Sequence, residues 1–366
     1  MAESPGAVAL FIQDLQLGGA ERVVVNLANG FVAAGLPVHV VVVRSGGALA
    51  ASLDPRVPVS VLGNSRTMAC LPPLVRWLEQ HRPRLLVAHL ENAAIAAIAA
   101  RWLARSWWGR VAVVEHALPS RTWATAQGKD RWIARVAGWA YPWADVLITV
   151  SQRAADTWTT RLGNRCPPVV VIPNPIVDAT FPARLASPPC PPLPAGTRPW
   201  IIGLGRLARV KEWPVLLQAL AERRLSGAAL ALLGDGPEAP ALAQMAQQLG
   251  IADRVWMPGA VSDPLPYLAQ ARVLALPSPQ EGFGNVVVEA LAAGLPVVAI
   301  KGSGGPEEIL DHGRYGRLVP PGDPVALANA LADLLEDAPG ADQRRARADD
   351  YRISRAVARY QALVAP

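Results

Sequence analysis

Cysteine is scarce in this chain of 366 residues. The three cysteines are Cys70, Cys166 and Cys190. Their odd number and wide spacing argue against a disulfide framework, a zinc site or a redox pair, and a reducing compartment fits them best. Also missing from the start of the chain is a basic stretch followed by an apolar core, so the sequence predicts no signal peptide.

Long apolar runs are missing as well. A membrane-spanning helix needs about 18 apolar residues with few charges. The nearest approach is residues 85–100, which contain His89 and Glu91. The sequence therefore predicts a cytoplasmic protein without a membrane-spanning helix.

Lysine is the rarest charged residue, with 3 lysines against 32 arginines. In so arginine-rich a chain, Lys211, shortly after Arg206, indicates a need for a compact charge on a flexible stem. Arg206 offers a planar fork for phosphate oxygens. Together they would neutralise a diphosphate leaving group, which a divalent metal often does in transferases. Because no Asp-x-Asp stands in a suitable loop, we predict a site without metal or other cofactor; the alternative is a solvated helix start.

The residues that are present describe a globular protein. Apolar residues make up 51% of the chain, and 366 residues leave room for two domains with separate cores. Alternating strand and helix patterns in residues 1–175 predict a parallel sheet covered by helices. Residues 176–199 are crowded with prolines and predict a linker. A second alternation fills residues 200–345, and residues 346–366 predict a final helix.

The individual elements follow from apolar runs and helical periodicity. The expected strands of the first half are residues 7–13, 38–44, 57–62, 84–90, 111–115, 145–150 and 168–172. The expected strands of the second half are residues 200–205, 228–233, 254–257, 272–276 and 296–300.

Two glutamates eight positions apart form the most informative motif, Glu281-Gly-Phe-Gly-Asn-Val-Val-Val-Glu289. A short apolar strand precedes it and a helical pattern follows, with Asn285 as the expected N-cap. Strand, loop and helix start leave the N–H groups of Phe283, Gly284 and Asn285 available to an anion. Carboxylates are acceptors suited to paired hydroxyl groups. A ligand with both phosphates and diols, such as a sugar nucleotide, explains the combination.

These residues resemble the Glu-(seven residues)-Glu signature of the retaining glycosyltransferases of family 4. Further matches occur in the expected order over almost the whole chain. They are Leu17-Gly-Gly-Ala-Glu21-Arg, Val150-Ser151, Ile172-Pro-Asn174-Pro, Gly205-Arg206-Leu with Lys211-Glu212, Leu233-Gly-Asp-Gly-Pro-Glu238 and Gly304-Gly-Pro-Glu307-Glu-Ile. The resemblance implies the GT-B fold, in which two Rossmann-like, doubly wound parallel-sheet domains face across a cleft and the final helix returns to the first domain.

The resemblance also implies roles for single residues. Glu289 would bind the ribose hydroxyls and Glu281 those of the transferred sugar. His116 would contact the donor sugar, although a capping or core histidine is an alternative. Gly18 and Gly19 would let the diphosphate approach a helix N-terminus, where the alternative is a simple tight turn.

Tryptophan is concentrated in one part of the chain. Eight of the 12 tryptophans lie between Trp102 and Trp158, and residues 101–165 hold ten basic residues against four acidic ones. Tryptophan with arginine is typical of a surface that contacts an anionic membrane, where lipid-linked acceptors are found. The alternative is core tryptophans beside a solvated basic face. No basic-aromatic motif indicates nucleic acid binding.

We therefore predict a retaining, metal-independent hexosyltransferase. It would move a hexose or N-acetylhexosamine from a nucleotide diphosphate sugar to a saccharide or lipid-linked saccharide. A UDP-sugar is favoured because Gly18-Gly19-Ala20-Glu21-Arg22 resembles bacterial surface-polysaccharide enzymes that use UDP-N-acetylhexosamines. The acceptor, the linkage, the form of the retaining mechanism and the oligomeric state stay open.

Other classes of protein share parts of this pattern. A GT-B epimerase would release an altered sugar without an acceptor, and a GDP-mannose-dependent mannosyltransferase would differ only in its donor. A non-catalytic bilobal sugar-binding protein would need an export signal. A phosphorylase would need a Schiff-base lysine, and neither Lys211 nor Lys301 has a matching context.

Overall fold

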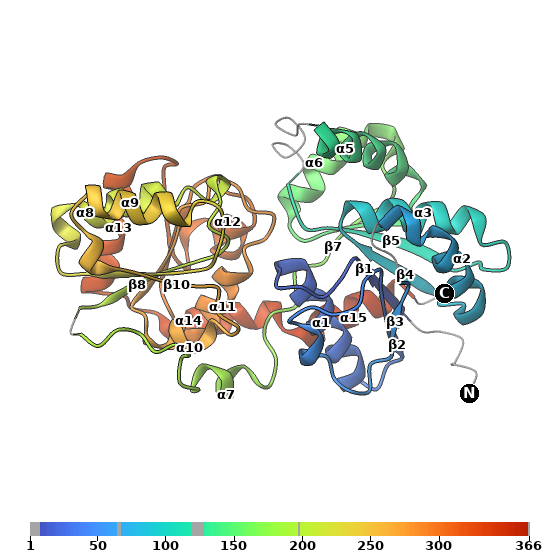
Figure 1. Cartoon of the computed structure of the whole chain (residues 1–366), viewed down its shortest axis with the longest axis horizontal. Coiled ribbons are helices and arrows are strands. Elements are labelled where there is room, and N and C mark those ends of the chain that lie inside the picture. The colour runs from blue at the N-terminus through green and yellow to red at the C-terminus, as the bar shows by residue number, and fades with distance from the viewer. Residues whose placement is uncertain (1–7, 64–66, 119–127, 197, 365–366) are drawn as a thin grey trace. The chain divides into compact units, whose positions relative to one another are not determined.

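The computed structural model describes residues 8–63, 67–118, 128–196 and 198–364. The chain divides into two compact units (Figure 1). The first unit consists of Met1–Ile176 with Tyr351–Pro366, and the second of Val177–Asp350. Each is built around its own parallel sheet covered by helices on both faces. The predicted fold class, two doubly wound parallel sheets, is confirmed.

The sheet of the first unit has the strand order β3-β2-β1-β4-β5-β6-β7, and neighbouring strands are parallel. Its central strands are continuous apolar runs because helices bury both faces. The strands are β1 (Val8–Ile12), β2 (Val38–Val42), β3 (Val59–Val61), β4 (Leu85–His89), β5 (Arg110–Glu115), β6 (Val146–Thr149) and β7 (Val169–Val171).

Helices from distant parts of the chain cover one face of this sheet. The helices α1 (Gly19–Ala33) and α15 (Ile353–Ala362) pack there side by side (Figure 1). Ile353, Ala356, Val357 and Tyr360 form the apolar stripe of α15 and are buried. The two helices approach closely at Gly30, where a Cβ atom would lie 2.3 Å from Cγ2 of Ile353. The final helix is therefore part of the first unit.

The opposite face carries α2 (Leu71–His81), α3 (Glu91–Leu103) and α5 (Gly128–Ala140) (Figure 1). The helix α3 packs through alanines, which let α2 and α5 lie close to it. The helix α6 (Gln152–Leu162) follows β6 and begins at Ser151, whose hydroxyl accepts a hydrogen bond from the backbone N–H of Ala154.

The sheet of the second unit has the order β10-β9-β8-β11-β12-β13 and is also parallel. Its strands are β8 (Trp200–Leu204), β9 (Ala229–Leu233), β10 (Val255–Gly259), β11 (Val273–Leu276), β12 (Val297–Ile300) and β13 (Arg317–Val319). The sequence patterns missed β13, because its sequence Arg-Leu-Val offers only two apolar residues, whereas the equally short edge strands β3 and β7 lie in longer apolar runs.

Helices cover both faces of this second sheet (Figure 1). On one face lie α8 (Trp213–Ala221), α9 (Ala239–Gln248) and α13 (Pro324–Glu336). On the other lie α10 (Leu265–Gln270), α11 (Asn285–Ala293) and α14 (Ala341–Ala348). A short helix, α12 (Gly305–Ile309), follows β12.

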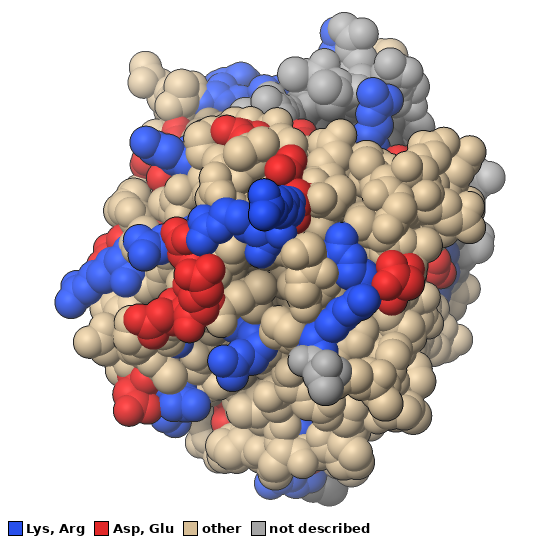
Figure 2. Space-filling view, turned by 90° about the vertical axis from the view of Figure 1, so that its left-hand side faces the viewer, with Lys and Arg blue, Asp and Glu red and all other residues tan. Residues whose placement is uncertain are grey.

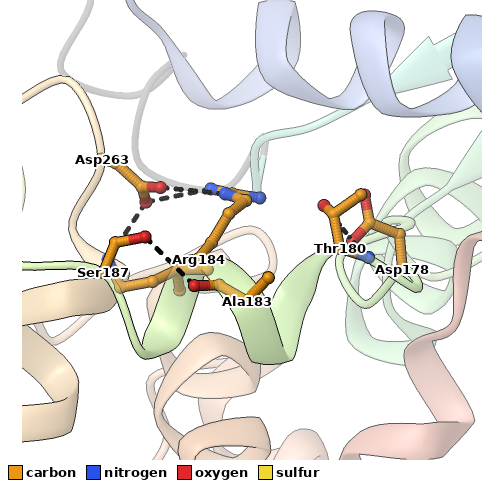
Figure 3. A network of polar contacts seen from close by, with 7 residues as sticks. Asp178, Thr180, Ala183, Arg184, Ser187 and Asp263 are labelled. Atoms are coloured by element: carbon orange, nitrogen blue, oxygen red, sulfur yellow. Dashed lines mark hydrogen bonds and ion pairs between the residues drawn. The ribbon is translucent and has the colours of Figure 1, made fainter.

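The proline-rich segment 176–199 is attached to the second unit rather than extended between domains. It contains α7 (Phe181–Leu185), which lies against α10. The Arg184 guanidinium donates two hydrogen bonds of 2.9 Å to the Asp263 carboxylate (Figure 3). The Tyr267 hydroxyl donates to the Pro191 carbonyl at 2.7 Å. These contacts give the segment a fixed conformation that its composition did not predict.

Candidate active site

Three loops meet at the carboxyl edge of the second sheet. They follow β8, β11 and β12, which are neighbours in the sheet. Because parallel strands all end at the same edge, their loops are brought together whatever their distance in the sequence. These loops carry Arg206 and Lys211, then Glu281, and then the glycines 304 and 305.

Lys211 and Glu281 form an ion pair between two of these loops. The Lys211 Nζ lies 2.5 Å from the Glu281 Oε1, and the side chains are 23% and 13% exposed. The backbone of Glu281 is held in turn by the third loop. Its N–H donates to the Ser303 carbonyl at 2.8 Å, and its carbonyl accepts from Gly305 at 3.3 Å. Lys211, predicted to bind phosphate, and Glu281, predicted to bind the sugar, are therefore in direct contact. Backbone hydrogen bonds to the third loop hold Glu281 in place.

Glycine is required where the second and third loops touch. A Cβ atom on Gly305 would lie 2.2 Å from the Phe283 carbonyl oxygen. Gly284 has φ 89°, a left-handed conformation that glycine adopts without steric cost, and a Cβ atom there would lie 2.9 Å from Cγ of Pro306. The close backbone approach fixes the start of α11 relative to Glu281.

The prediction that Asn285 caps α11 is wrong. The helix begins at Asn285, and Gly284 occupies the N-cap position without a side-chain hydrogen bond to the helix start. The left-handed backbone at that position explains the difference, since it selects glycine over asparagine. Because the N-cap residue has no side chain at the helix start, this N-terminus still suits an anion.

Arg206 lies on an exposed turn after β8. Its carbonyl accepts a hydrogen bond of 3.0 Å from the Trp213 indole, while its guanidinium makes no ion pair with other described residues. The turn rests on the loop after β9, where a Cβ atom on Gly234 would lie 2.0 Å from the Gly205 carbonyl oxygen. The Gly-Asp-Gly motif after β9 therefore supports the position of Arg206.

Glu289 lies in α11 and is 6% exposed. Its charge acts on Arg184, a residue that the sequence analysis did not select. Burial lowers the pKa of Arg184, but the hydrogen bonds and charge of Asp263, with the charges of Asp178 and Glu289, outweigh burial and raise that pKa. Figure 3 shows Arg184 on α7 directed at Asp263. Because Arg184 lies in a segment predicted to be a linker, the sequence analysis had no signal for this role.

The helix start predicted to receive the diphosphate in the first unit carries a carboxylate of its own. Gly18 is the N-cap of α1, and a Cβ atom on it would lie 2.1 Å from Oε2 of Glu21. Burial raises the pKa of Glu21, its own backbone N–H lowers it, and the charge of Asp14 raises it further. A carboxylate folded over Gly18, next to Gly19, disfavours an anion at this position.

His116 follows β5 at the carboxyl edge of the first sheet. Its ring meets that of His89, the last residue of β4, edge to edge and nearly in one plane, with centroids 5.3 Å apart and planes at 22°. The His89 Nδ1 lies 3.0 Å from the His116 Nε2. Burial lowers the pKa of His116 to about 4, and burial together with the charge of His116 holds the pKa of His89 well below its ordinary value. Both rings are therefore neutral at pH 7.

Glu115 lies on the other face of β5 and accepts a hydrogen bond from the Tyr141 hydroxyl. Burial raises the pKa of Glu115 to about 8, although the Tyr141 hydrogen bond lowers it; the charge of Glu91 raises it further. This carboxyl group is therefore mostly protonated in the folded protein at pH 7 and ionised in the unfolded chain.

A pH-dependent stability follows. Between about pH 4.5 and pH 8 the folded state binds more protons at Glu115 than the unfolded state does, so this group lowers stability as the pH rises. We expect Glu115→Gln to raise the free energy of unfolding at pH 8 by at least about 1 kcal/mol and to leave it nearly unchanged at pH 4. Urea titrations at both pH values, with exposed Asp156→Asn as control, measure this. Equal effects at the two pH values would contradict the raised pKa.

The structure separates the clustered tryptophans into two groups. Trp107 and Trp158 are buried in the core, whereas five others are exposed. The exposed ones are Trp102, Trp108, Trp132, Trp139 and Trp143. Trp123 lies outside the described residues. The core interpretation therefore holds for Trp107 and Trp158, whereas a membrane contact of the exposed tryptophans stays a prediction.

Charge on the second unit is mixed. Ion pairs there join Arg198 to Asp253 and Arg224 to Asp333. Figure 2 shows basic and acidic side chains interspersed over one face of the molecule. The described part of that face lacks the broad basic surface that nucleic acid binding requires.

Two further searches concern the described residues alone. No group of three or more His, Cys, Asp or Glu side chains among them is arranged to hold a metal ion. None of the helices they form is both long enough and apolar enough to cross a membrane.

Two doubly wound parallel sheets with functional loops at their carboxyl edges define the GT-B class, and solved proteins of that class share this fold. HepE of Anabaena, solved with UDP and glucose, superposes with a TM-score of 0.79 at 22% identity, over 98% of this chain and 99% of that one. Sucrose-phosphate synthase from Thermosynechococcus elongatus has a TM-score of 0.77 at 22% identity, over 98% of both chains.

Sequence comparison identifies the family. Residues 17–179 match the family described as Glycosyltransferase Family 4, and residues 198–337 match Glycosyl transferases group 1. The chain belongs to the family 4 glycosyltransferases, with a family 4 domain followed by a group 1 domain. The resemblance on which the sequence analysis relied is confirmed.

Curated relatives match over part of their length. A GDP-mannose-dependent alpha-(1-6)-phosphatidylinositol monomannoside mannosyltransferase of Mycolicibacterium smegmatis is 40% identical over 164 residues, which is 42% of this chain and 41% of that protein. The lipopolysaccharide core biosynthesis glycosyltransferase LpsE of Rhizobium meliloti is 37% identical over 139 residues, 38% of this chain and 40% of that protein. The matched region thus spans about two fifths of the length of these relatives.

Proposed function

We propose that this protein is a retaining, metal-independent glycosyltransferase that moves a hexose or N-acetylhexosamine from a nucleotide diphosphate sugar to a saccharide or lipid-linked saccharide. One observation carries the proposal, namely the Lys211–Glu281 pair held between braced loops at the carboxyl edge of the second sheet. Membership of a glycosyltransferase family supports it.

The pair divides the work on the donor between charge and hydroxyl recognition. Lys211 and the exposed Arg206 bind the diphosphate and stabilise the negative charge that develops as it leaves. Glu281 accepts hydrogen bonds from hydroxyls of the transferred sugar. Before the donor binds, the Glu281 carboxylate neutralises the Lys211 charge. When the diphosphate binds to Lys211, the ion pair breaks and Glu281 becomes available to the sugar hydroxyls.

Glu289 binds the ribose hydroxyls in this proposal. The charge of Glu289 acts on Arg184, which is hydrogen-bonded to Asp263, so a cation lies in the electrostatic surroundings of Glu289. The N–H groups at Phe283, Gly284 and Asn285 assist at the phosphate. The Gly18-Gly19 turn is less suited to bind the phosphate, because the Glu21 carboxylate lies over Gly18.

Two donors have support among similar proteins. HepE was solved with UDP, whereas the Mycolicibacterium smegmatis relative uses GDP-mannose. We favour a UDP-sugar, with GDP-mannose as the second candidate. An epimerase of the same fold differs in needing no acceptor, so release of an altered free sugar would identify it.

Thermal denaturation with a panel of nucleotide sugars tests the proposal. A donor at about 100 times its Kd should stabilise the protein by about 2.7 kcal/mol and raise the Tm. Turnover should be the same with and without EDTA. Absence of stabilisation by every nucleotide sugar would reject the donor site, and loss of activity with EDTA that magnesium restores would reject the metal-free site.

A tryptophan stripe on the first unit favours a lipid-linked acceptor. We define the stripe as Trp132, Val136, Trp139 and Trp143, which recur at helical spacing along α5 and the turn after it. They are 67%, 40%, 61% and 53% exposed, while the opposite face of α5 is buried in the core. Trp102 extends the stripe, because its ring meets the Trp143 ring edge to face with the ring centroids 4.9 Å apart.

So continuous an exposed apolar surface marks a binding face. Tryptophan is typical of the membrane–water interface, and the flanking arginines suit anionic headgroups. Arg135 lies 5.8 Å from the ring centre of Trp132, and Arg105 is exposed at the end of α3. We propose that the stripe makes a peripheral contact with an anionic membrane, at which the acceptor would be found.

Vesicle binding tests this contact. We expect the protein to co-sediment with anionic vesicles, less so as salt rises, because each basic residue near the surface contributes about 1 kcal/mol that salt screens. Trp139→Ser with Trp143→Ser, or Arg105→Glu with Arg135→Glu, should reduce binding, whereas Val325→Ser, at an exposed apolar residue of the second unit, should not. Binding that ignores lipid charge would contradict the proposal.

A further inference from the structure

The paired histidines of the first unit, the buried His89 and the half-buried His116, have no assigned use as a pair. His89 ends β4 and His116 follows β5, two neighbouring strands. His89 is 0% exposed, and its ring is held by the hydrogen bond between its Nδ1 and the His116 Nε2, which joins the two rings edge to edge. Their side chains lie on the sheet face covered by α1 and α15, whereas Glu115 and Tyr141 belong to the other face.

The hydrogen bond couples the two rings. Two neutral imidazoles share one proton between the facing nitrogens, so one ring donates and the other accepts. The outer nitrogens are then set as well: one carries a proton and the other a lone pair. Fixing the proton of one ring fixes the tautomer of the other.

Both outer nitrogens are buried without a hydrogen-bond partner among the described residues. They are the Nε2 of His89 and the Nδ1 of His116. Buried polar atoms are seldom left unpaired, because their lost hydration is not replaced. Each of the two coupled rings therefore keeps one nitrogen whose hydrogen-bonding capacity is unused by the described residues.

The backbone at this position is strained. Leu90, directly after His89, has φ 73° and ψ 153°, a conformation that residues with a side chain rarely adopt. Such strain persists only where the surroundings enforce it, and it collects at functional sites. The strained residue here is Leu90, which joins the end of β4 at His89 to the start of α3.

We infer that His89 is a positioning residue that holds His116 in one orientation and one tautomer, so that His116 presents its Nδ1 to a hydroxyl group of the bound saccharide. A neutral ring nitrogen suits a hydroxyl, which can donate or accept, better than it suits a phosphate or a cation. The inference rests on the proposed function for the identity of the ligand, whereas the pairing of the rings does not.

Ring-nitrogen NMR of the wild-type protein tests the pairing without any variant or substrate. The chain has five histidines, so their signals can be assigned by single substitutions. At pH 7 we expect His89 and His116 each to be a single neutral tautomer, with one proton between them. A mixture of tautomers on His116, or a charged ring, would overturn the inference.

Enzyme kinetics test the role of the pair. We expect His89→Leu to lower kcat/KM about 10- to 100-fold, as loss of an orienting partner does, and His89→Asn, whose amide can replace Nδ1, to recover most of it. His89→Gln, with its amide one carbon farther out, should not. Because His89 acts through His116, adding His89→Leu to His116→Ala should cost nothing more. A further loss in that double variant would overturn the inference.

Separate KM values distinguish the two sources of the hydroxyl. A raised KM for the nucleotide sugar assigns it to the donor, and a raised KM for the acceptor assigns it to the acceptor; a change in neither would overturn the inference. The affinity for the bare nucleoside diphosphate should be the same in all His89 variants. No turnover by the wild-type protein with any nucleotide sugar would instead reject the proposed function and leave the NMR result standing.

Discussion

Lys211→Ala is expected to lower kcat/KM by about 100-fold or more, as when a charge contact made in the transition state is lost. Its amine is one of three side-chain cations in the loop after β8, with those of Arg206 and Arg209, and lies in direct contact with Glu281. Removing it leaves a carboxylate that is 13% exposed without its partner, which adds repulsion of the incoming diphosphate to the loss of attraction. Arg206→Ala should have a similar effect on activity.

Lys301→Ala is the matched control, because Lys301 is an exposed lysine at the start of the neighbouring loop. It removes the same charge from the same unit and should leave kcat/KM within about twofold, as exposed charges usually contribute little. The double variant Lys211→Ala with Glu281→Gln should bind the diphosphate better than Lys211→Ala alone, since the unpaired carboxylate is gone. Equal losses for Lys301→Ala and Lys211→Ala would show a general charge effect and contradict the assigned site.

Glu281→Gln and Glu289→Gln are expected to have opposite effects. Glu281→Gln should lower kcat by about 100-fold, because an amide replaces an acceptor-only carboxylate at the sugar. Since that substitution also frees the Lys211 amine, affinity for the bare nucleoside diphosphate should stay equal or increase. Glu289→Gln should instead weaken binding of the nucleoside diphosphate by about 10-fold, the loss of charged hydrogen bonds to the ribose.

Pyrophosphate separates these two roles. It has no ribose, so Glu289→Gln should leave its affinity unchanged, and calorimetric titration of both ligands measures the difference. Exposed Glu222→Gln serves as a control for loss of one carboxylate from the second unit. Because Glu289 is buried near Arg184, its variant also needs a Tm measurement. Equal weakening of diphosphate binding by both substitutions would contradict the division of roles.

Local patterns were sufficient for the fold. Apolar runs of four to six residues, separated by helical stretches, are properties of neighbouring residues, and they predicted most strands and the doubly wound class. The short edge strand β13 was missed because its Arg-Leu-Val sequence contains only two apolar residues, whereas the equally short β3 and β7 lie in longer apolar runs. The cap of α11 was misjudged because asparagine and glycine are both accepted at N-caps, and only the left-handed backbone at Gly284 decides between them.

What the sequence alone determined about this protein is its two-sheet architecture, its family and the residue types of the proposed donor site. Which of those residues touch was decided by the tertiary structure. Lys211 and Glu281 are 70 positions apart and meet because β8 and β11 are neighbours, and His89 meets His116 because β4 lies beside β5. Likewise, only packing separated the buried Trp158 from the exposed Trp139. Strand order and packing depend on long-range burial of apolar faces, which no local spacing of residues contains.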